Sequence, residues 1–141
     1  MRARRTDRGR TRIILGTSFL IDVLRGEKTV EEAVRTVDNR GTAHVSSVTV
    51  MELWEGVHLA DSSEDERTVV KNLLTDVREL PFDRKCAMTA GEINATLHRN
   101  GTPIEDADVM IAATALVHDV PVVTNNVDRF ERIDDLEILT Y

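Results

Sequence analysis

The fold is decided by a stretch near the amino terminus, Ile13-Ile14-Leu15-Gly16-Thr17-Ser18-Phe19-Leu20-Ile21-Asp22-Val23-Leu24. Its first three residues are apolar, and small and hydroxyl residues follow them. Apolar residues then recur at the three- and four-residue spacing of a helix. The stretch therefore predicts a buried strand, a tight turn centred on Gly16 and a helix. In α/β proteins, the turn after the carboxyl end of a strand is where ligands and chemistry gather.

The rest of the chain continues the alternation of strand and helix patterns. Further short strands are predicted at residues 43–46, 79–82, 121–124 and 136–139. Helical patterns are predicted at residues 29–40, 47–57, 63–77, 83–99 and 106–117. Ser47 or Thr49 could cap the helix at 47–57, and Asp83 can cap the helix at 83–99. Alternation of this kind indicates a mainly parallel sheet with helices on both faces. We therefore expect one α/β/α domain at residues 13–141, with four to five strands and with the segment around Pro81 at an edge.

The composition is that of an ordinary soluble domain, with 41% hydrophobic and 30% charged residues among 141. No apolar run approaches the roughly 18 residues of a transmembrane helix, so no membrane association is expected. The single cysteine, Cys86, cannot form an internal disulfide, which fits a reducing cytoplasm. The four histidines are scattered without metal-ligand spacing, and neither a glycine-rich phosphate loop nor a GxSxG motif is present.

Charge is unevenly distributed along the chain. The net charge of −7 argues against a broad basic face for nucleic acid. Residues 1–12 nevertheless contain six arginines and one aspartate, so this segment carries +5 and the remainder −12. We expect residues 1–12 to be a flexible basic extension, and a phosphate-binding tail is the alternative.

Four acidic residues follow predicted strands or open predicted helices: Glu52, Asp106, Asp108 and Asp128. Helix starts gather at the carboxyl edge of a parallel sheet, so these carboxylates could converge on one cleft. Clustered carboxylates repel one another unless a hard cation neutralises them, and Mg²⁺ or Mn²⁺ is the natural partner. Such a site activates water and holds a phosphodiester during in-line displacement.

Each of these acidic residues, taken alone, is better explained as a helix cap. Asp106 and Asp108 differ by two positions and so point about 200° apart on a helix. Only one of them is expected to face the cleft. Asp106 is the better cap candidate, and Asp108 directly precedes the apolar face.

Four motifs together resemble the PIN-domain family, and specifically the VapC-type toxins of toxin–antitoxin pairs. The resemblance covers nearly the whole chain, from about Arg12 to Tyr141. The motifs are Ile13-Leu15 with Thr17-Ser18-Phe19-Leu20-Ile21-Asp22, Ser46 through Gly56, Ile104 through Ala115, and Val123 through Ile133.

The resemblance implies a metal-dependent endoribonuclease that acts as the toxin of a VapBC-like system. It also implies Mg²⁺ or Mn²⁺ as cofactor, an RNA substrate such as tRNA, homodimers and inhibition by a small VapB-like antitoxin whose tail fills the cleft. The residues that it places in the site are the catalytic and metal-binding Glu52, Asp108 and Asp128, with Thr17, Ser18 and Asn126 as supporting polar groups.

The chain departs from the family pattern at Gly16, where the first family carboxylate falls. A second hypothesis is therefore a catalytically weak or inactive PIN-fold protein that binds an antitoxin or RNA. A receiver-like phospho-acceptor domain is a third possibility. It needs a lysine near a late strand and an acceptor aspartate after a middle strand, and the sequence offers neither.

Overall fold

The computed structural model describes residues 6–7, 10–29, 31–32, 35 and 42–140. The predicted helix at residues 29–40 lies mostly outside the described residues. The described strands and helices alternate as the sequence predicts, and they are β1 (Thr6–Asp7), β2 (Arg10–Leu15), α1 (Thr17–Leu24), β3 (Thr42–Ser46), α3 (Ser47–Leu59), α4 (Ser63–Thr75), β4 (Arg78–Leu80), α5 (Arg84–Arg99), α6 (Asp106–His118), β5 (Val122–Val123), α7 (Val127–Phe130) and β6 (Ile138–Leu139).

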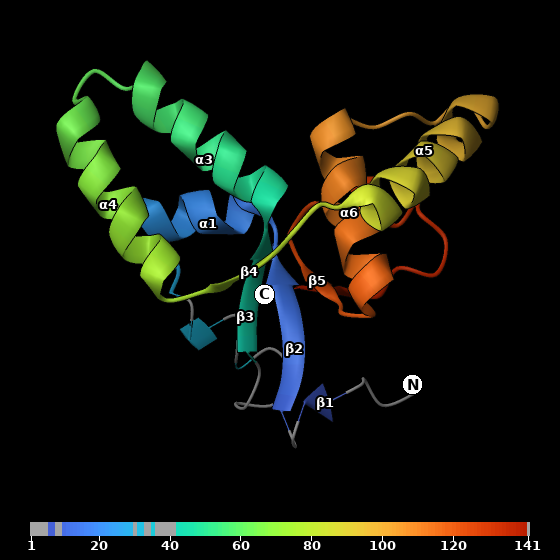
Figure 1. Cartoon of the computed structure of the whole chain (residues 1–141), viewed down its shortest axis with the longest axis horizontal. Helices are drawn as coiled ribbons and strands as arrows, with labels where there is room; N and C mark the ends of the chain where they lie inside the picture. The colour runs from blue at the N-terminus through green and yellow to red at the C-terminus, as the bar shows by residue number, and fades with distance from the viewer. Residues whose placement is uncertain (1–5, 8–9, 30, 33–34, 36–41, 141) are drawn as a thin grey trace.

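Strand β2 lies in the middle of the sheet (Figure 1). The strand order is β4-β3-β2-β5-β6, and all four pairings along this path are parallel. This confirms the predicted α/β domain with a mainly parallel sheet, and it places β4 at an edge, as Pro81 indicates. β1 pairs antiparallel with β2 through Thr6 opposite Thr11 and Asp7 opposite Arg10. β2 therefore begins at Arg10 rather than at the predicted Ile13.

Alternate residues of β2 enter two different hydrophobic cores, because side chains alternate between the faces of a strand. Ile13 and Leu15 belong to a core formed with α1, α3 and α4, whereas Ile14 belongs to a core formed with α5 and α6. Figure 1 shows the corresponding two helical lobes above the carboxyl end of β2. Phe19 and Leu20 bury the inner side of α1 in the first core. The central strand β2 thus packs against a helical layer on each face of the sheet.

The N-cap of α3 differs from the predicted one. Ser46, and not the predicted Ser47 or Thr49, caps α3, because its Oγ accepts a hydrogen bond of 3.1 Å from the backbone N–H of Val48. Ser47 instead accepts a hydrogen bond of 2.9 Å from the backbone N–H of Phe82. The observed cap lies one residue before Ser47 and three residues before Thr49, and helix boundaries are ordinarily imprecise by one or two residues.

The predicted N-cap is confirmed for α5 and is wrong for α6. Asp83 caps α5 as predicted, with Oδ1 accepting a hydrogen bond of 3.1 Å from the N–H of Cys86. α6 has Glu105 at the N-cap position, and the predicted cap Asp106 lies one residue inside the helix. Asp106 is engaged elsewhere, since its Oδ1 accepts a hydrogen bond of 3.2 Å from Asn94 Nδ2.

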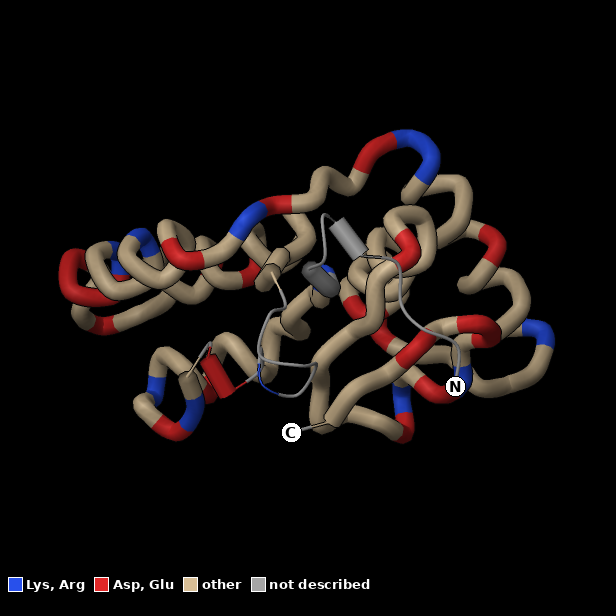
Figure 2. Tube along the Cα trace, turned by 90° about the horizontal axis from the view of Figure 1, so that it is seen from below, with Lys and Arg blue, Asp and Glu red and all other residues tan. Residues whose placement is uncertain are grey.

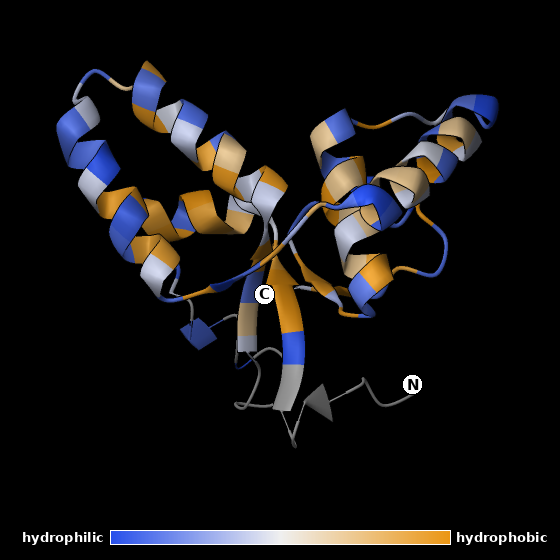
Figure 3. Ribbon diagram, in the orientation of Figure 1, coloured by the Kyte–Doolittle hydropathy of each residue, from blue (hydrophilic) through white to orange (hydrophobic). Residues whose placement is uncertain are grey.

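The surface carries both signs of charge. Figure 2 shows basic positions interspersed with acidic ones along the described chain. Figure 3 shows apolar residues concentrated on α1 and on the carboxyl half of β2, which are the elements nearest the two cores. Among the described residues, no helix combines the length and apolarity needed to cross a membrane.

Candidate active site

The candidate site lies where β2, β3 and β5 end. Gly16 follows β2 directly, α3 follows β3 without a gap, and Thr124 follows β5. β2 is parallel to both of its neighbours, so the three carboxyl ends meet at one edge of the sheet. The N–H of Gly16 donates a hydrogen bond of 3.1 Å to the carbonyl oxygen of Val123, which fixes the opening turn to β5.

Glu52 is held in place by the first helix. The hydroxyl of Thr17, the first residue of α1, donates a hydrogen bond of 2.6 Å to Glu52 Oε1. Thr17 Oγ1 also lies 3.1 Å from Thr49 Oγ1, and Thr49 is fully buried one turn before Glu52 on α3. Two hydroxyl groups therefore connect α1 to α3, and they orient the glutamate carboxylate at the sheet edge.

Asp108 enters the site from the first turn of α6. Its Oδ2 lies 3.0 Å from an Nη atom of Arg129, and the same Nη atom lies 3.5 Å from Glu105 Oε1. The Asp108 side chain is 18% exposed, whereas Arg129 is 45% and Glu105 73% exposed. Sequence reasoning did not select Arg129 or Glu105, because nothing in the pattern shows which basic residue pairs with which carboxylate.

Ser18 and Asn126 close the site between α1 and α7. Asn126 Nδ2 donates a hydrogen bond of 3.4 Å to Ser18 Oγ, and the backbone N–H of Asn126 donates one of 3.0 Å to Thr124 Oγ1. The amide nitrogen of Asn126 is thus directed to Ser18, and the amide oxygen is the atom that could contact a cation. Both residues occupy the sheet edge expected from their sequence positions.

These groups line one cavity of about 180 Å³, hereafter the cleft. Five of the six predicted site residues line it, namely Thr17, Ser18, Glu52, Asp108 and Asn126. The remaining lining residues are Gly16, Ile21, Glu105, Ala107, Thr124, Arg129 and Phe130. The structure therefore brings together residues that are more than 100 positions apart in the sequence.

Asp128 is the predicted site residue that does not line the cleft. It lies on α7 and is exposed, while its neighbours Asn126, Arg129 and Phe130 contribute to the lining. Asp106 is also exposed and outside the lining. Of the two aspartates that open α6, only Asp108 faces the cleft, as the helical spacing indicates.

The backbone at Gly16 does not require glycine. Gly16 has φ −70° and ψ 156°, which any residue adopts, and it occupies the N-cap position of α1. A Cβ atom built there would lie 3.3 Å from the carbonyl oxygen of Val123 and 3.6 Å from Thr124 Cβ. A larger residue is therefore sterically close but would need only a small adjustment. The dihedral angles of Gly16 therefore do not require glycine, whereas the carbonyl oxygen of Val123 leaves little room for a Cβ atom.

The cleft offers oxygen ligands of the kind that a hard divalent cation uses. Glu52 and Asp108 provide two carboxylates, and Asn126 provides a neutral oxygen. Mg²⁺ commonly binds through one or two carboxylates with the remaining positions taken by water. Within the described residues, no group of three or more His, Cys, Asp and Glu side chains is clustered tightly enough to hold a metal ion. The donor set thus fits a divalent ion, with no carboxylate at Gly16.

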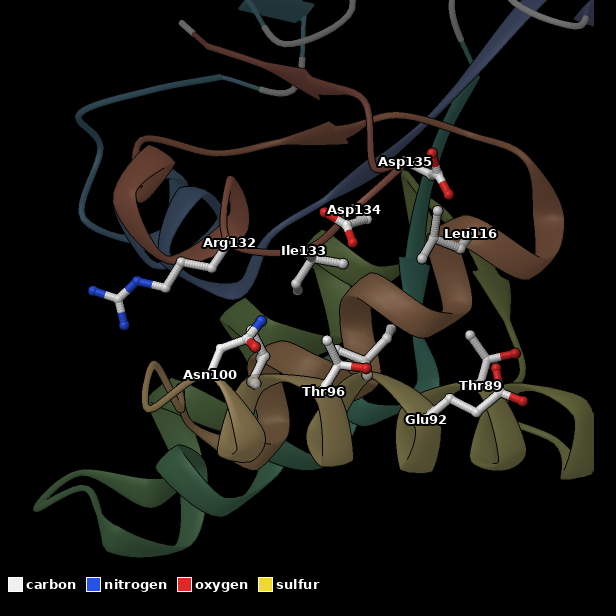
Figure 4. A pocket seen from close by; sticks show the side chains of 11 residues that line it. Thr89, Glu92, Thr96, Asn100, Leu116, Arg132, Ile133, Asp134 and Asp135 are labelled. Carbon is white, nitrogen blue, oxygen red and sulfur yellow. The ribbon is translucent and has the colours of Figure 1, made fainter.

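A second cavity lies apart from the cleft. It has a volume of about 240 Å³ and lies between α5, α6 and the segment that follows α7 (Figure 4). Figure 4 shows Thr89, Glu92 and Thr96 in a row along α5, with Asn100 at its C-terminal end. The two cavities share no lining residue. The second cavity therefore adds nothing to the carboxylate chemistry of the cleft.

An α/β/α domain with carboxylates at the carboxyl edge of a parallel sheet has its site where α/β proteins bind ligands, with donors suited to a divalent cation. Residues 13–136 match the family model described as PIN domain, and the chain belongs to the PIN-domain family. PIN-domain nucleases generally depend on a divalent metal ion. The match begins at Ile13 and so includes the opening strand and turn.

Comparison with individual proteins places the chain among the VapC ribonucleases of this family. It is 36% identical over 113 residues to the tRNA(fMet)-specific endonuclease VapC of Salmonella typhimurium, covering 79% of this chain and 86% of that protein. It is 32% identical over 120 residues to Ribonuclease VapC2 of Haemophilus influenzae, covering 85% and 90%. The DNA-bound VapBC structure from Salmonella typhimurium superimposes with a TM-score of 0.82 at 31% identity, covering 92% of this chain and 98% of that one.

Proposed function

We propose that this protein is an endoribonuclease that uses Mg²⁺ or Mn²⁺ and acts as the toxin of a VapBC-type toxin–antitoxin system. The observation that carries the proposal is the convergence of Glu52 from α3 and Asp108 from α6 on one cleft. Membership of the VapC ribonucleases supports the choice of RNA as substrate. The size of the cleft suits a phosphodiester and a hydrated ion rather than a large organic cofactor.

Asp108 is the chief proposed metal ligand. Its carboxylate is mostly buried, and it lies at the N-terminus of α6, where a negative charge is stabilised by the helix dipole. Glu52 is the second proposed ligand, and its orientation comes from the Thr17 hydroxyl. A divalent ion bound there would polarise the phosphodiester and lower the pKa of water. Ser18 and Asn126 would position the attacking water or the phosphate.

Asp128 keeps a proposed role at the margin of the site. It lies on α7 between Asn126 and Arg129, which line the cleft, although it does not line the cleft itself. A carboxylate there adds to the negative charge that attracts a divalent ion. An Asp128→Asn variant should therefore lose less activity than an Asp108→Asn variant.

The substrate is proposed to be tRNA. The Salmonella typhimurium relative is named as a tRNA(fMet)-specific endonuclease, and it is 36% identical to this chain over 113 residues. Positive charge at the cleft comes from Arg129, while the body of the protein is acidic overall. A folded RNA would be positioned by a small number of phosphate contacts and not by a broad basic face.

The proposed partner is a small VapB-like antitoxin. A groove of about 470 Å³ runs between α1, α3 and α4 and shares Thr17, Ile21 and Glu52 with the cleft. Its lining combines apolar side chains with three acidic residues and one basic residue, and these are Ile21, Leu24, Leu53 and Val70 with Glu52, Glu55, Glu66 and Arg25. An amphipathic segment with basic residues has the chemistry to occupy it. Similar solved structures from Salmonella typhimurium and Haemophilus influenzae are VapBC structures, which supports this partner. We also propose that the protein is a cytoplasmic homodimer.

A second candidate function is a catalytically weak PIN-fold protein that binds an antitoxin or RNA. Gly16 favours it, because the cleft lacks a carboxylate next to Thr17. Fewer negative charges lower the affinity for a divalent ion. The two functions differ in the amount of RNA cleavage at a physiological Mg²⁺ concentration.

Expression of the protein in a bacterial host tests the proposed toxin activity. The wild-type chain should arrest growth and produce cleaved tRNA, and an Asp108→Asn variant should do neither at the same protein level. Growth arrest by both proteins would show that the toxicity does not depend on Asp108, and would contradict the proposed active site. Growth without RNA cleavage under wild-type expression would favour the catalytically weak alternative.

A further inference from the structure

Arg129 is a positive charge built into the cleft. It lies on the short helix α7, and its guanidinium reaches across to the start of α6, where an Nη atom lies 3.0 Å from Asp108 Oδ2. This ion pair joins residues 21 positions apart and is partly shielded, since Asp108 is only 18% exposed. A charge-assisted hydrogen bond at this distance is among the stronger polar contacts available to a side chain.

The same carboxylate is the chief proposed metal ligand. A guanidinium and a divalent ion repel each other, and they compete for the lone pairs of one carboxylate. A cation can therefore reach Asp108 Oδ2 fully only if Arg129 moves away. Of the lining residues, Glu52, Glu105 and Asp108 are acidic and Arg129 is basic, and Gly16 adds no charge.

Glu105 offers Arg129 a second position. Its Oε1 lies 3.5 Å from the same Nη atom, and its side chain is 73% exposed. The guanidinium can thus move toward Glu105 and solvent without losing an acidic partner. In the structure, Arg129 contacts Asp108 and Glu105 at the same time. A shift of the guanidinium toward Glu105 would leave Asp108 available to a metal ion.

We infer that Arg129 is an internal counterion that competes with the divalent metal ion for Asp108 and raises the metal concentration that the site needs. This inference rests on the proposed function, because it takes Asp108 to be a metal ligand. Arg129 acts here through another residue, so its role is regulation of metal binding rather than direct catalysis.

Mn²⁺ binding measured by electron paramagnetic resonance tests the inference without RNA. Removing the charge in Arg129→Gln should tighten Mn²⁺ binding by roughly three- to tenfold, the range for one partly shielded ion pair. Arg129→Lys keeps a positive charge and should stay within about twofold of wild type. Arg132→Gln is the matched control, because Arg132 contacts the carbonyl oxygen of Pro103 and does not line the cleft.

A double variant tests whether the effect passes through Asp108. In an Asp108→Asn background, the additional Arg129→Gln change should give no gain in Mn²⁺ affinity. Circular dichroism melting of each variant checks that the fold is retained. A persistent gain in that background would place the action of Arg129 elsewhere and overturn the inference.

The outcomes separate this inference from the proposed function. RNA cleavage that requires Mg²⁺, together with an Arg129→Gln variant that binds Mn²⁺ no more tightly than wild type, would overturn the inference and leave the proposed function standing. An absence of Mn²⁺ binding at millimolar concentration in both proteins would overturn both. Tighter binding in Arg129→Gln, absent in the double variant, would support both.

Discussion

Thr17 Oγ1 lies 2.6 Å from Glu52 Oε1, and this hydrogen bond links α1 to α3 across 35 residues of sequence. Thr17 follows the turn after β2, and Glu52 lies on the second turn of α3, so the contact joins the ends of two neighbouring parallel strands. The bond gives a carboxylate one defined orientation in the cleft. Orientation of this kind matters because a misplaced catalytic group costs rate even when the fold is unchanged.

A Thr17→Val variant should lose this orientation while keeping the shape of the side chain. We expect the rate of RNA cleavage to fall roughly tenfold, because Glu52 loses its fixed donor. Thr17→Ser retains the hydroxyl and should recover most of the rate. Initial cleavage rates and melting temperatures of the three proteins check this. A Thr17→Val protein as active as wild type would show that Glu52 needs no such donor.

A Gly16→Asp variant should strengthen metal binding. The new carboxylate would lie at the N-cap of α1 beside Glu52 and Asp108, and its Cβ would need only a small shift from the Val123 carbonyl oxygen, 3.3 Å away. We expect Mn²⁺ affinity to rise about tenfold, with faster RNA cleavage at low Mg²⁺.

Gly16→Asn is the matched control for that experiment, because it has the same Cβ contact and nearly the same shape without the charge. Isothermal titration with Mn²⁺ compares both variants with wild type. Equal affinity in Gly16→Asp and wild type would indicate that another group already fills the place of the first carboxylate.

An Ile14→Ala variant tests the role of β2 in the fold. Ile14 is fully buried at the centre of the sheet and packs into the core with α5 and α6. Its truncation should lower the free energy of unfolding by about 2–5 kcal/mol. Leu59→Ala, at a side chain that is 77% exposed, should change it by less than about 0.5 kcal/mol. Urea unfolding measures both, and similar values for the two variants would refute this packing.

Stability should fall as the pH is lowered from about 7 toward 5. Burial lowers the pKa of His44, and the neighbouring charges of Arg12 and Arg78 act in the same direction. Burial also lowers the pKa of His118, again with Arg12. The unfolded chain binds protons first as the pH falls through about 6.5, so protonation favours unfolding.

Melting temperatures at pH 7.5 and 5.5 measure this effect. A His44→Gln variant should show a smaller decrease between these two pH values than wild type, whatever its absolute stability. His58→Gln, at an exposed position, should keep the wild-type decrease. An unchanged pH dependence in His44→Gln would show that other groups cause the loss.

The sequence predicts the layers of this fold because its apolar residues follow strand and helix periods closely. Ile13 to Leu15 and the α1 pattern lead directly to the two cores, and Asp83 is recognisable as a cap from its position alone. The cap of α3 is less predictable, since Ser46, Ser47 and Thr49 all have suitable side chains. Packing then decides among them, and it assigns Ser47 to Phe82 and Thr49 to Thr17.

Site geometry is only partly accessible from sequence. Glu52 and Asp108 can be selected because they follow strands and open helices, positions that converge in a parallel sheet. The Arg129–Asp108 pair depends on the direction of a long side chain from a four-residue helix, which no periodicity reveals. The exposure of Asp128 cannot be predicted from the sequence either, because a single helical turn has no repeating pattern that marks its inner face.

The most direct test of the central claim is the initial rate of tRNA cleavage by the purified wild-type protein, measured across a Mg²⁺ titration with and without EDTA and repeated with Asp108→Asn. Cleavage should rise with Mg²⁺, disappear in EDTA and fall at least about 100-fold in the variant. Cleavage that persists in EDTA, or that is equally fast in Asp108→Asn, would contradict a divalent metal site built on Asp108.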